Sequence, residues 1–256
     1  MTRTIKIVII APFTADLTSS KPQIDGFCRP GVEVTQTSLI AGPASNESRV
    51  DEAMAVPGML ATALQAKKDG AHALVINCMS DPGLSALREA VSIPVVGVAQ
   101  VSMATATSLA HSFGIVAVLD RAAPVMRDNA AHCGYESRYV GCRSVEIPVL
   151  ELHSRLSEAK NGLNRRALEL VEQEGAGAII LGCGALMGCA GEMREFLTER
   201  GIDVPIIDPL PATVSFAVIL VEQGLSHSRI SYPQCQVKFY KGYEFVDQTR
   251  INKLPV

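Results

Sequence analysis

The apolar residues of this chain gather in short runs that alternate with longer segments of helical periodicity. Residues 5–10 and 114–119 are continuous apolar runs, which are typical of parallel strands covered on both faces. Residues 32–39 and 138–147 are expected to form the second strand of each half. Because strands and helices alternate, the pattern predicts an α/β protein with parallel sheets and right-handed crossovers.

Two long segments, residues 50–68 and 150–174, are expected to be helices that end near a glycine. We expect the first helix to be interrupted at Pro57 and Gly58, because both residues disfavour a helix interior. The apolar residues 214–221 and the tyrosine-rich stretch near Tyr240 follow the second half, and we expect this C-terminal segment to complete the first half.

A short pattern that ends in cysteine occurs twice. The first copy reads Gly-Ala-x-Ala-Leu-Val-Ile-Asn-Cys and ends at Cys78, and the second reads Gly-Ala-x-Ala-Ile-Ile-Leu-Gly-Cys and ends at Cys183. Each copy predicts a helix end, a buried strand and a thiol. We therefore expect two pseudo-symmetric Rossmann-like lobes, the first from residues 1–97 and 209–256 and the second from residues 98–208. Ligands of such sheets bind outside the carboxyl ends of the strands, so we expect the active site in the interlobe cleft.

Composition narrows the classes of function. A net charge of -3 gives no basic surface, so nucleic acid is not an expected partner. No apolar run is long enough to cross a membrane, and the first residues lack the apolar stretch of a signal peptide. Seven cysteines, an odd number, suit reduced thiols in the cytoplasm better than a secreted chain. We expect a cytoplasmic protein that acts on a small molecule, has no membrane partner and forms a homo-oligomer.

Several short motifs together resemble one family. They are Gly42-Pro43-Ala44-Ser45-Asn46-Glu47-Ser48 with Asp51-Glu52-Ala53, Cys78-x-x-Asp81-Pro82-Gly83-Leu84, Pro94-Val95-Val96-Gly97, Pro148-Val149-Leu150-Glu151-Leu152 and Leu181-Gly182-Cys183. In combination they resemble the hydantoin and allantoin racemase branch of the aspartate/glutamate racemase superfamily, over nearly the whole chain. The resemblance implies racemisation without a cofactor or metal, with Cys78 and Cys183 as acid and base.

Two thiols suit this chemistry. Inversion at a carbon between a carbonyl and a nitrogen needs a base on one face and an acid on the other. A thiol ionises near pH ~8.5, and a helix N-terminus or a cation favours its thiolate. Both cysteines lie between a strand and an expected helix start, where backbone N–H groups favour negative charge. The N–H groups that could bind the developing oxyanion belong to Met79, Ser80, Gly184 and Ala185.

The chain departs from the family pattern where substrate would be held. The first strand ends in Ala11-Pro12-Phe13-Thr14 instead of a polar turn, and the equivalent place in the second half carries Asp120. Phe13, Thr14, Ser45 and Asp120 are therefore candidate substrate-binding residues. A neutral side chain near Cys78 favours an aryl or alkyl hydantoin over a free amino acid, which needs a cation for its carboxylate.

Other interpretations stay open. An isolated cysteine at a strand end is usually a small buried hydrophobe, and we expect the other five cysteines to be structural. Asp81 belongs either to a turn or to the surroundings of the thiol, and residues 45–48 form a loop over substrate, a helix cap or both. The alternatives to a racemase are a one-thiol enzyme similar to maleate isomerase or arylmalonate decarboxylase, and a non-catalytic small-molecule-binding protein.

Overall fold

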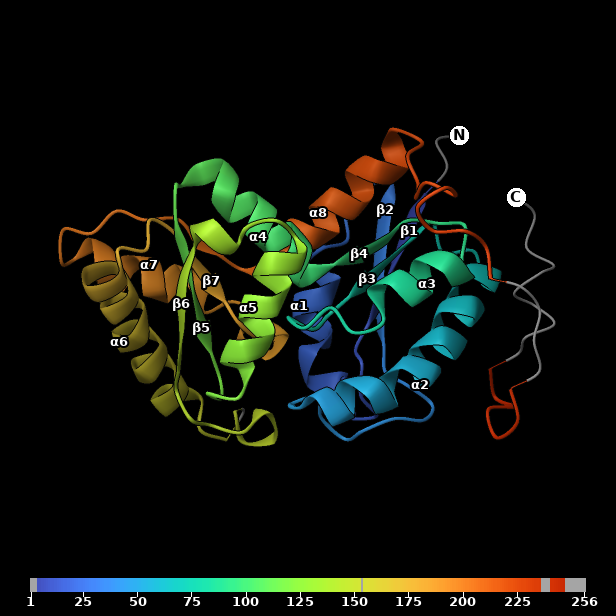
Figure 1. Ribbon diagram of the computed structural model, residues 1–256, viewed down its shortest axis with the longest axis horizontal. Coiled ribbons are helices and arrows are strands. Elements are labelled where there is room, and N and C mark those ends of the chain that lie inside the picture. The colour runs from blue at the N-terminus through green and yellow to red at the C-terminus, as the bar shows by residue number, and fades with distance from the viewer. Residues whose placement is uncertain (1–3, 153, 236–239, 247–256) are drawn as a thin grey trace. The chain divides into compact units, whose positions relative to one another are not determined.

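The computed structural model describes residues 4–152, 154–235 and 240–246 of the chain (Figure 1). The chain divides into two compact units. Unit 1 contains Met1–Gly97 and Thr213–Val256, and unit 2 contains Val98–Ala212. Each unit has a four-stranded sheet in which all strands are parallel, so the chain has the α/β fold that the alternating pattern predicts.

The sheet of unit 1 has the strand order β2-β1-β3-β4. Its strands are β1 (Ile5–Ile10), β2 (Val32–Thr37), β3 (Ala73–Ile76) and β4 (Val95–Gly97). The pairing register places Ile10 beside both Thr37 and Ile76. The carboxyl ends of the first three strands are therefore level, and the loops that follow them leave the sheet at one edge.

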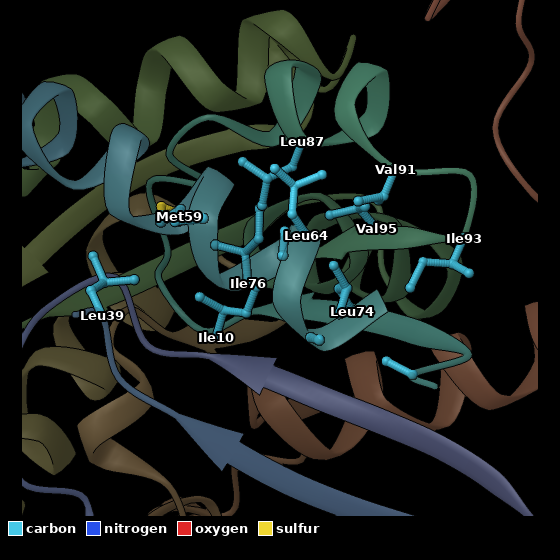
Figure 2. Packing of buried hydrophobic residues seen from close by; sticks show 14 of the residues in the cluster. Ile10, Leu39, Met59, Leu64, Leu74, Ile76, Leu87, Val91, Ile93 and Val95 are labelled. Atoms are coloured by element: carbon cyan, nitrogen blue, oxygen red, sulfur yellow. The ribbon is translucent and has the colours of Figure 1, made fainter. Parts of the chain in front are cut away.

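The helices of unit 1 cover this sheet with apolar side chains. They are α1 (Lys21–Asp25), α2 (Arg49–Lys68) and α3 (Leu84–Ala90), with a 3-10 turn η1 (Thr18–Ser20) before α1. Figure 2 shows Met59 and Leu64 of α2 and Leu87 of α3 packed against Leu74 and Ile76 of β3. All five side chains are buried, and β3 is buried along its whole length. This packing fixes the strand that ends two residues before Cys78.

Helix α2 is continuous through Pro57, so the expected interruption was wrong. Proline removes only one backbone donor, and the buried residues Ala55, Met59 and Leu64 hold both halves of the helix against the core. Gly58 has a different role. A β-carbon on Gly58 would lie 2.0 Å from the carbonyl oxygen of Ala41, so glycine allows the loop after β2 to lie directly on the helix.

Unit 2 repeats the order of strands seen in unit 1. Its sheet has the order β6-β5-β7-β8. Its strands are β5 (Phe113–Ala117), β6 (Tyr139–Ser144), β7 (Ile179–Leu181) and β8 (Ile206–Ile207), and its helices are α4 (Val98–Leu109), α5 (Ala122–His132), α6 (Leu156–Glu174) and α7 (Ala190–Thr198). Helices α6 and α7 cover one face of the sheet and α4 and α5 cover the other (Figure 1). Helix α8 (Pro209–Glu222) follows β8 and continues into the residues of unit 1.

The helix expected from residue 150 begins later. The structure has a 3-10 turn η3 (Val149–Glu151) followed by α6 from Leu156, and a second 3-10 turn η2 (Glu136–Arg138) precedes β6. Leu150 is 66% exposed, so burial of its side chain does not stabilise a helix at this point. Ala159 and Leu163, inside α6, are buried. Among the described helices, none is long and apolar enough to cross a membrane.

The described part of the C-terminal segment is bound to unit 1. His227 Nε2 accepts a 2.7 Å hydrogen bond from the backbone N–H of Val95, at the first residue of β4. The guanidinium of Arg229 donates to the carbonyl oxygens of Arg88 and Val91 at 3.1 and 2.6 Å. Burial lowers the pKa of His227 to about 4, and the positive charges of Arg88 and Arg229 act in the same direction.

Candidate active site

Cys78 lies at the carboxyl end of β3 in unit 1. The ladder continues past the strand, because Asn77 donates its backbone N–H to the carbonyl oxygen of Ile10 at 2.9 Å. Cys78 is half-buried, and the N–H of Asp81 donates to its carbonyl oxygen at 2.9 Å in a tight turn. The helix α3 begins only at Leu84. Residues 79–83 therefore separate Cys78 from the first residue of α3.

Ser80 lies beside Cys78, and Glu52 lies in the first turn of α2. The sulfur of Cys78 lies 3.3 Å from the hydroxyl oxygen of Ser80. Burial raises the pKa of Glu52, and the Ser80 hydroxyl and the charge of Arg49 oppose this shift. Sequence reasoning assigned no role to Glu52, although the residue was part of the Asp51-Glu52-Ala53 motif.

The loops after β1 and β2 are joined by backbone hydrogen bonds. Leu39 donates its N–H to the carbonyl oxygen of Phe13, and Thr14 donates its N–H to that of Pro43, both at 2.9 Å. The Thr14 hydroxyl lies 3.3 Å from the same Pro43 oxygen. The strand register therefore brings Phe13, Thr14 and Cys78 to one edge of the sheet. Ser45 follows Pro43 in the same loop and is half-buried.

Residues 45–48 do contain a helix cap, as one of the two interpretations predicts. The capping residue is Ser48, whose hydroxyl oxygen accepts a hydrogen bond from the N–H of Asp51 at 3.2 Å. The Ser48 hydroxyl in turn donates to the Asp51 carboxylate at 2.7 Å. The cap fixes the first turn of α2, and so it also fixes Glu52.

The side chain of Asp81, in the Cys78 loop, packs against the end of β4. Its backbone has a left-handed φ of 46°, and a β-carbon built on Gly97 would lie 2.3 Å from the carboxyl carbon of Asp81. The Asp81 carboxylate thus occupies the space that the β-carbon of any other residue at position 97 would fill. This geometry corresponds to the turn interpretation of Asp81.

Cys183 lies in the equivalent place in unit 2, after β7. Gly182 donates its N–H to Val116 O at 2.7 Å, and a β-carbon at Gly182 would lie 2.9 Å from that oxygen. Only glycine therefore lets the chain pass so close to β5. Cys183 is half-buried and directly precedes a 3-10 turn, η4 (Gly184–Leu186). Gly184 and Ala185 belong to this turn.

Asp208 fastens the Cys183 loop to the end of β8. Its carboxylate accepts the N–H of Gly188 at 2.8 Å. Burial raises the pKa of Asp208, and the N–H groups of Gly188 and Leu210 oppose this shift. Unit 1 has the same two residue types in exchanged places. There the aspartate, Asp81, lies on the cysteine loop and the glycine, Gly97, lies at the strand end, whereas in unit 2 the aspartate lies at the strand end and the glycine on the loop. Sequence reasoning missed Asp208, whose only signal is that it is the first polar residue after β8.

Asp120 lies in a cluster of polar groups at the carboxyl ends of β5 and β6. Its N–H donates to Glu146 Oε1 at 2.8 Å, and the buried Ser144 hydroxyl contacts the carboxylates of both Asp120, at 2.5 Å, and Glu146. Burial raises the pKa of the neighbouring Cys142 to about 12, and the charge of Asp120 acts in the same direction. Cys142 therefore stays a thiol, as expected for a structural cysteine.

Comparison with known proteins agrees with this geometry. A sequence model of the family described as Asp/Glu/Hydantoin racemase matches residues 18–217. The chain belongs to this family. The hydantoin racemase of Pseudomonas sp. (strain NS671) is 33% identical to it over 84% of this chain and 84% of that protein. The hydantoin racemase of Rhizobium meliloti is 32% identical over 79% of this chain and 82% of that protein.

A solved structure supports the same assignment. The allantoin racemase from Klebsiella pneumoniae superposes with a TM-score of 0.85 at 28% identity, over 94% of this chain and 99% of that chain. The protein is thus an isomerase of the racemase type, similar to hydantoin and allantoin racemases. The resemblance seen in the sequence motifs is confirmed at the level of the family.

Within each unit, the racemase places its predicted site residues at the carboxyl edge of the sheet. Cys78 and Cys183 each follow the third strand of a sheet with the same strand order. Met79 is buried while Ser80 and Gly184 are half-buried, and Ala185 is exposed. Cys189 is the N-cap of α7 and is buried, as expected for a core residue. In the described part of the chain, no group of three or more His, Cys, Asp or Glu side chains could hold a metal ion.

Proposed function

We propose that this racemase inverts a carbon that lies α to a carbonyl and carries a nitrogen, in a 5-substituted hydantoin or a related ring. The reaction uses Cys78 and Cys183 as acid and base and needs no cofactor. One observation carries the proposal. The two thiols occupy topologically equivalent positions, each directly after the third strand of a parallel sheet. Inversion in both directions requires an acid and a base on opposite faces of the carbon, and two thiols can exchange these roles.

In the proposed mechanism the two cysteines act on opposite faces of one substrate carbon. The thiolate of one cysteine takes the α-proton, and the electron pair moves onto the carbonyl oxygen to give an enolate. The N–H groups of Met79, Ser80, Gly184 and Ala185 are the donors proposed to stabilise that oxygen. The other cysteine then gives its proton to the opposite face of the carbon. Each turnover exchanges the protonation states of the two thiols.

The polar groups of unit 2 favour a neutral, nitrogen-rich substrate. The carboxylates of Asp120 and Glu146 lie at the carboxyl edge of the sheet, joined through Ser144. Carboxylates accept hydrogen bonds from ring N–H groups and repel a substrate carboxylate. In unit 1, Phe13 supplies an apolar ring at the corresponding edge. A hydantoin with an apolar 5-substituent fits these groups better than a free amino acid does.

The test follows proton exchange and inversion separately in D2O. Each enantiomer of 5-benzylhydantoin is incubated with the parent enzyme and with Cys78→Ser and Cys183→Ser, and NMR and chiral chromatography record the two processes. Each variant is expected to lose net racemisation by about 10²–10⁴-fold, since a positioned general base contributes that much. Each variant should retain some exchange without inversion for the enantiomer whose proton faces the remaining cysteine. The losses in the double variant will not add.

Cys133→Ser is the matched control, because Cys133 is a half-buried cysteine at the end of α5. Full racemisation in either single active-site variant would exclude the two-base mechanism and favour a one-thiol enzyme or a binding protein. The same exchange assay on allantoin and on amino acids identifies the substrate.

We further propose a cytoplasmic homo-oligomer. The odd number of cysteines, seven, suits a reducing compartment, and light scattering measures the oligomeric state.

A further inference from the structure

The residue after the fourth strand differs between the two units. Unit 1 reads Pro94-Val95-Val96-Gly97, and the corresponding segment of unit 2 reads Pro205-Ile206-Ile207-Asp208. In both units this strand is the neighbour of the strand that precedes the cysteine. The repeat thus has an acid beside the strand that precedes Cys183, at a place where unit 1 has glycine.

Asp208 and Cys183 lie at the same edge of one sheet. Ile180 of β7 pairs with Ile207 of β8, so Asp208 follows directly after the last pair of the ladder. Cys183 comes three residues after Ile180. The chain therefore leaves the carboxyl edge of the sheet at Asp208 and at Cys183 on neighbouring strands.

The loop after Cys183 is held at two points by different acceptors. The carbonyl oxygen of Cys183 accepts the N–H of Leu186 at 3.0 Å, which closes the first part of the loop. The N–H of Gly188 is instead donated to the Asp208 carboxylate, at 2.8 Å. Gly188 has a left-handed φ of 88°, a conformation that favours glycine, so the chain turns at the residue that Asp208 holds.

We propose that Asp208 is a positioning residue for Cys183, because its carboxylate holds Gly188 and so keeps the loop and its thiol where the substrate carbon is reached. The inference rests on the proposed two-cysteine function. Asp208 acts through the loop and does not touch the reacting atoms. Gly184 and Ala185, the proposed oxyanion donors of this unit, lie between the two held points. Their N–H groups begin the 3-10 turn and have no acceptor within it, which suits donors to a substrate oxygen.

Three substitutions separate this role from helix capping. Asp208 occupies the N-cap position of α8, because the helix begins at Pro209. Asp208→Ala removes both the cap and the acceptor for Gly188. Asp208→Ser keeps a capping hydroxyl, but its oxygen is one bond closer to the backbone and no longer reaches Gly188. Asp208→Asn keeps both functions, since its amide oxygen accepts an N–H.

The first test measures racemisation of 5-benzylhydantoin per folded molecule, with folding followed by circular dichroism. Asp208→Ala and Asp208→Ser should each lower kcat by about 10–10²-fold, since a misplacement of about 1 Å can cost about 10²-fold. KM should stay near the parent value, because the held loop acts on the transition state. Asp208→Asn should recover most of the parent rate. Asp203→Ala removes an exposed aspartate before β8 and is the matched control, expected to behave as the parent does.

Two outcomes of this test contradict the proposal. Parent kcat in Asp208→Ser would show that Asp208 serves only as a helix cap. An Asp208→Asn protein as slow as Asp208→Ser would show that the acceptor for Gly188 is not what the reaction needs. Either result overturns the positioning role.

The second test uses amide hydrogen exchange, which reports on the loop without turnover. In the full-length protein, the peptide that contains residues 184–188 should exchange at least about tenfold faster in Asp208→Ser than in the parent, because Gly188 loses a charged acceptor. The peptide that contains Cys78 should not change. Faster loop exchange together with racemisation that survives Cys183→Ser would support the hold on the loop and refute the two-cysteine function. Unchanged loop exchange together with the expected loss of racemisation in both cysteine variants would overturn this inference alone.

Discussion

Replacing Gly97 by alanine is expected to destabilise the end of β4 and to displace the Cys78 loop. The new β-carbon would lie 2.3 Å from the carboxyl carbon and Oδ2 of Asp81 and 2.5 Å from Oδ1. Relief of this clash requires the Asp81 side chain to leave its position above Gly97 or the loop to move. Overpacking of this kind costs about 1–3 kcal/mol of unfolding free energy. For a chain of this size the melting temperature falls by about 2–4 °C for each kcal/mol.

A double-mutant cycle tests the cause. Asp81→Ala alone should destabilise, because alanine keeps the left-handed backbone and loses the carboxylate. In Asp81→Ala/Gly97→Ala the clashing atoms are gone, so the double variant should be more stable than the sum of the single effects predicts, by about 1–3 kcal/mol. Urea unfolding of the four proteins, followed by circular dichroism, gives this coupling energy.

Gly191→Ala is the matched control. Gly191 lies in α7, and no atom lies within 4 Å of a β-carbon built on it. Alanine there should stabilise by about 0.5–1 kcal/mol, because glycine costs more backbone entropy in a helix. A Gly97→Ala protein as stable as the parent, or strictly additive effects in the cycle, would refute the steric reasoning.

Three further predictions concern pH, the helix cap and the thiols. The pKa of His227 is about 4 in the folded protein, below its ordinary value of 6.5. As the pH falls from 6.5 to 4, His227 therefore binds a proton in the unfolded chain but not in the folded protein. Stability measured by urea unfolding should fall from pH 6.5 toward 4, and His227→Gln should flatten this dependence. Ser48→Ala should cost about 0.5–2 kcal/mol in the same assay, because Asp51 loses its cap. Racemisation should survive dialysis against a chelator but be lost on alkylation, with substrate protecting Cys78 and Cys183. Chelator-sensitive activity would contradict the thiol mechanism.

Much of the fold could be predicted from the chain because parallel strands leave a local signal. The apolar run of β1 is the kind of segment that only a strand covered on both faces can bury, and β5 repeats it. The repeated pattern ending in Cys78 and Cys183 also gave the equivalence of the two sheets. The uninterrupted helix through Pro57 was not predictable, since tertiary packing outweighed the local preference.

The surroundings of the thiols were less accessible to sequence reasoning. The contact between the Ser80 hydroxyl and the Cys78 sulfur depends on the turn that the chain makes after β3, and no local pattern reports such a contact. Asp208 reaches Gly188 for the same kind of reason, across the end of the sheet. The position of Cys78 relative to α3 depends on the left-handed backbone at Asp81, which delays the helix.

The loops after β1 and β2 are joined through main-chain atoms, and this has a consequence for how the protein can evolve or be engineered. The bonds from Leu39 to Phe13 and from Thr14 to Pro43 use N–H and carbonyl groups that almost every residue provides. Side chains at positions 13, 14 and 45 are thus free to vary while the loop frame is kept. If the proposed site is correct, saturation libraries at these positions change substrate recognition without changing the cysteines, so the proposed recognition residues and the proposed acid/base pair can be altered separately.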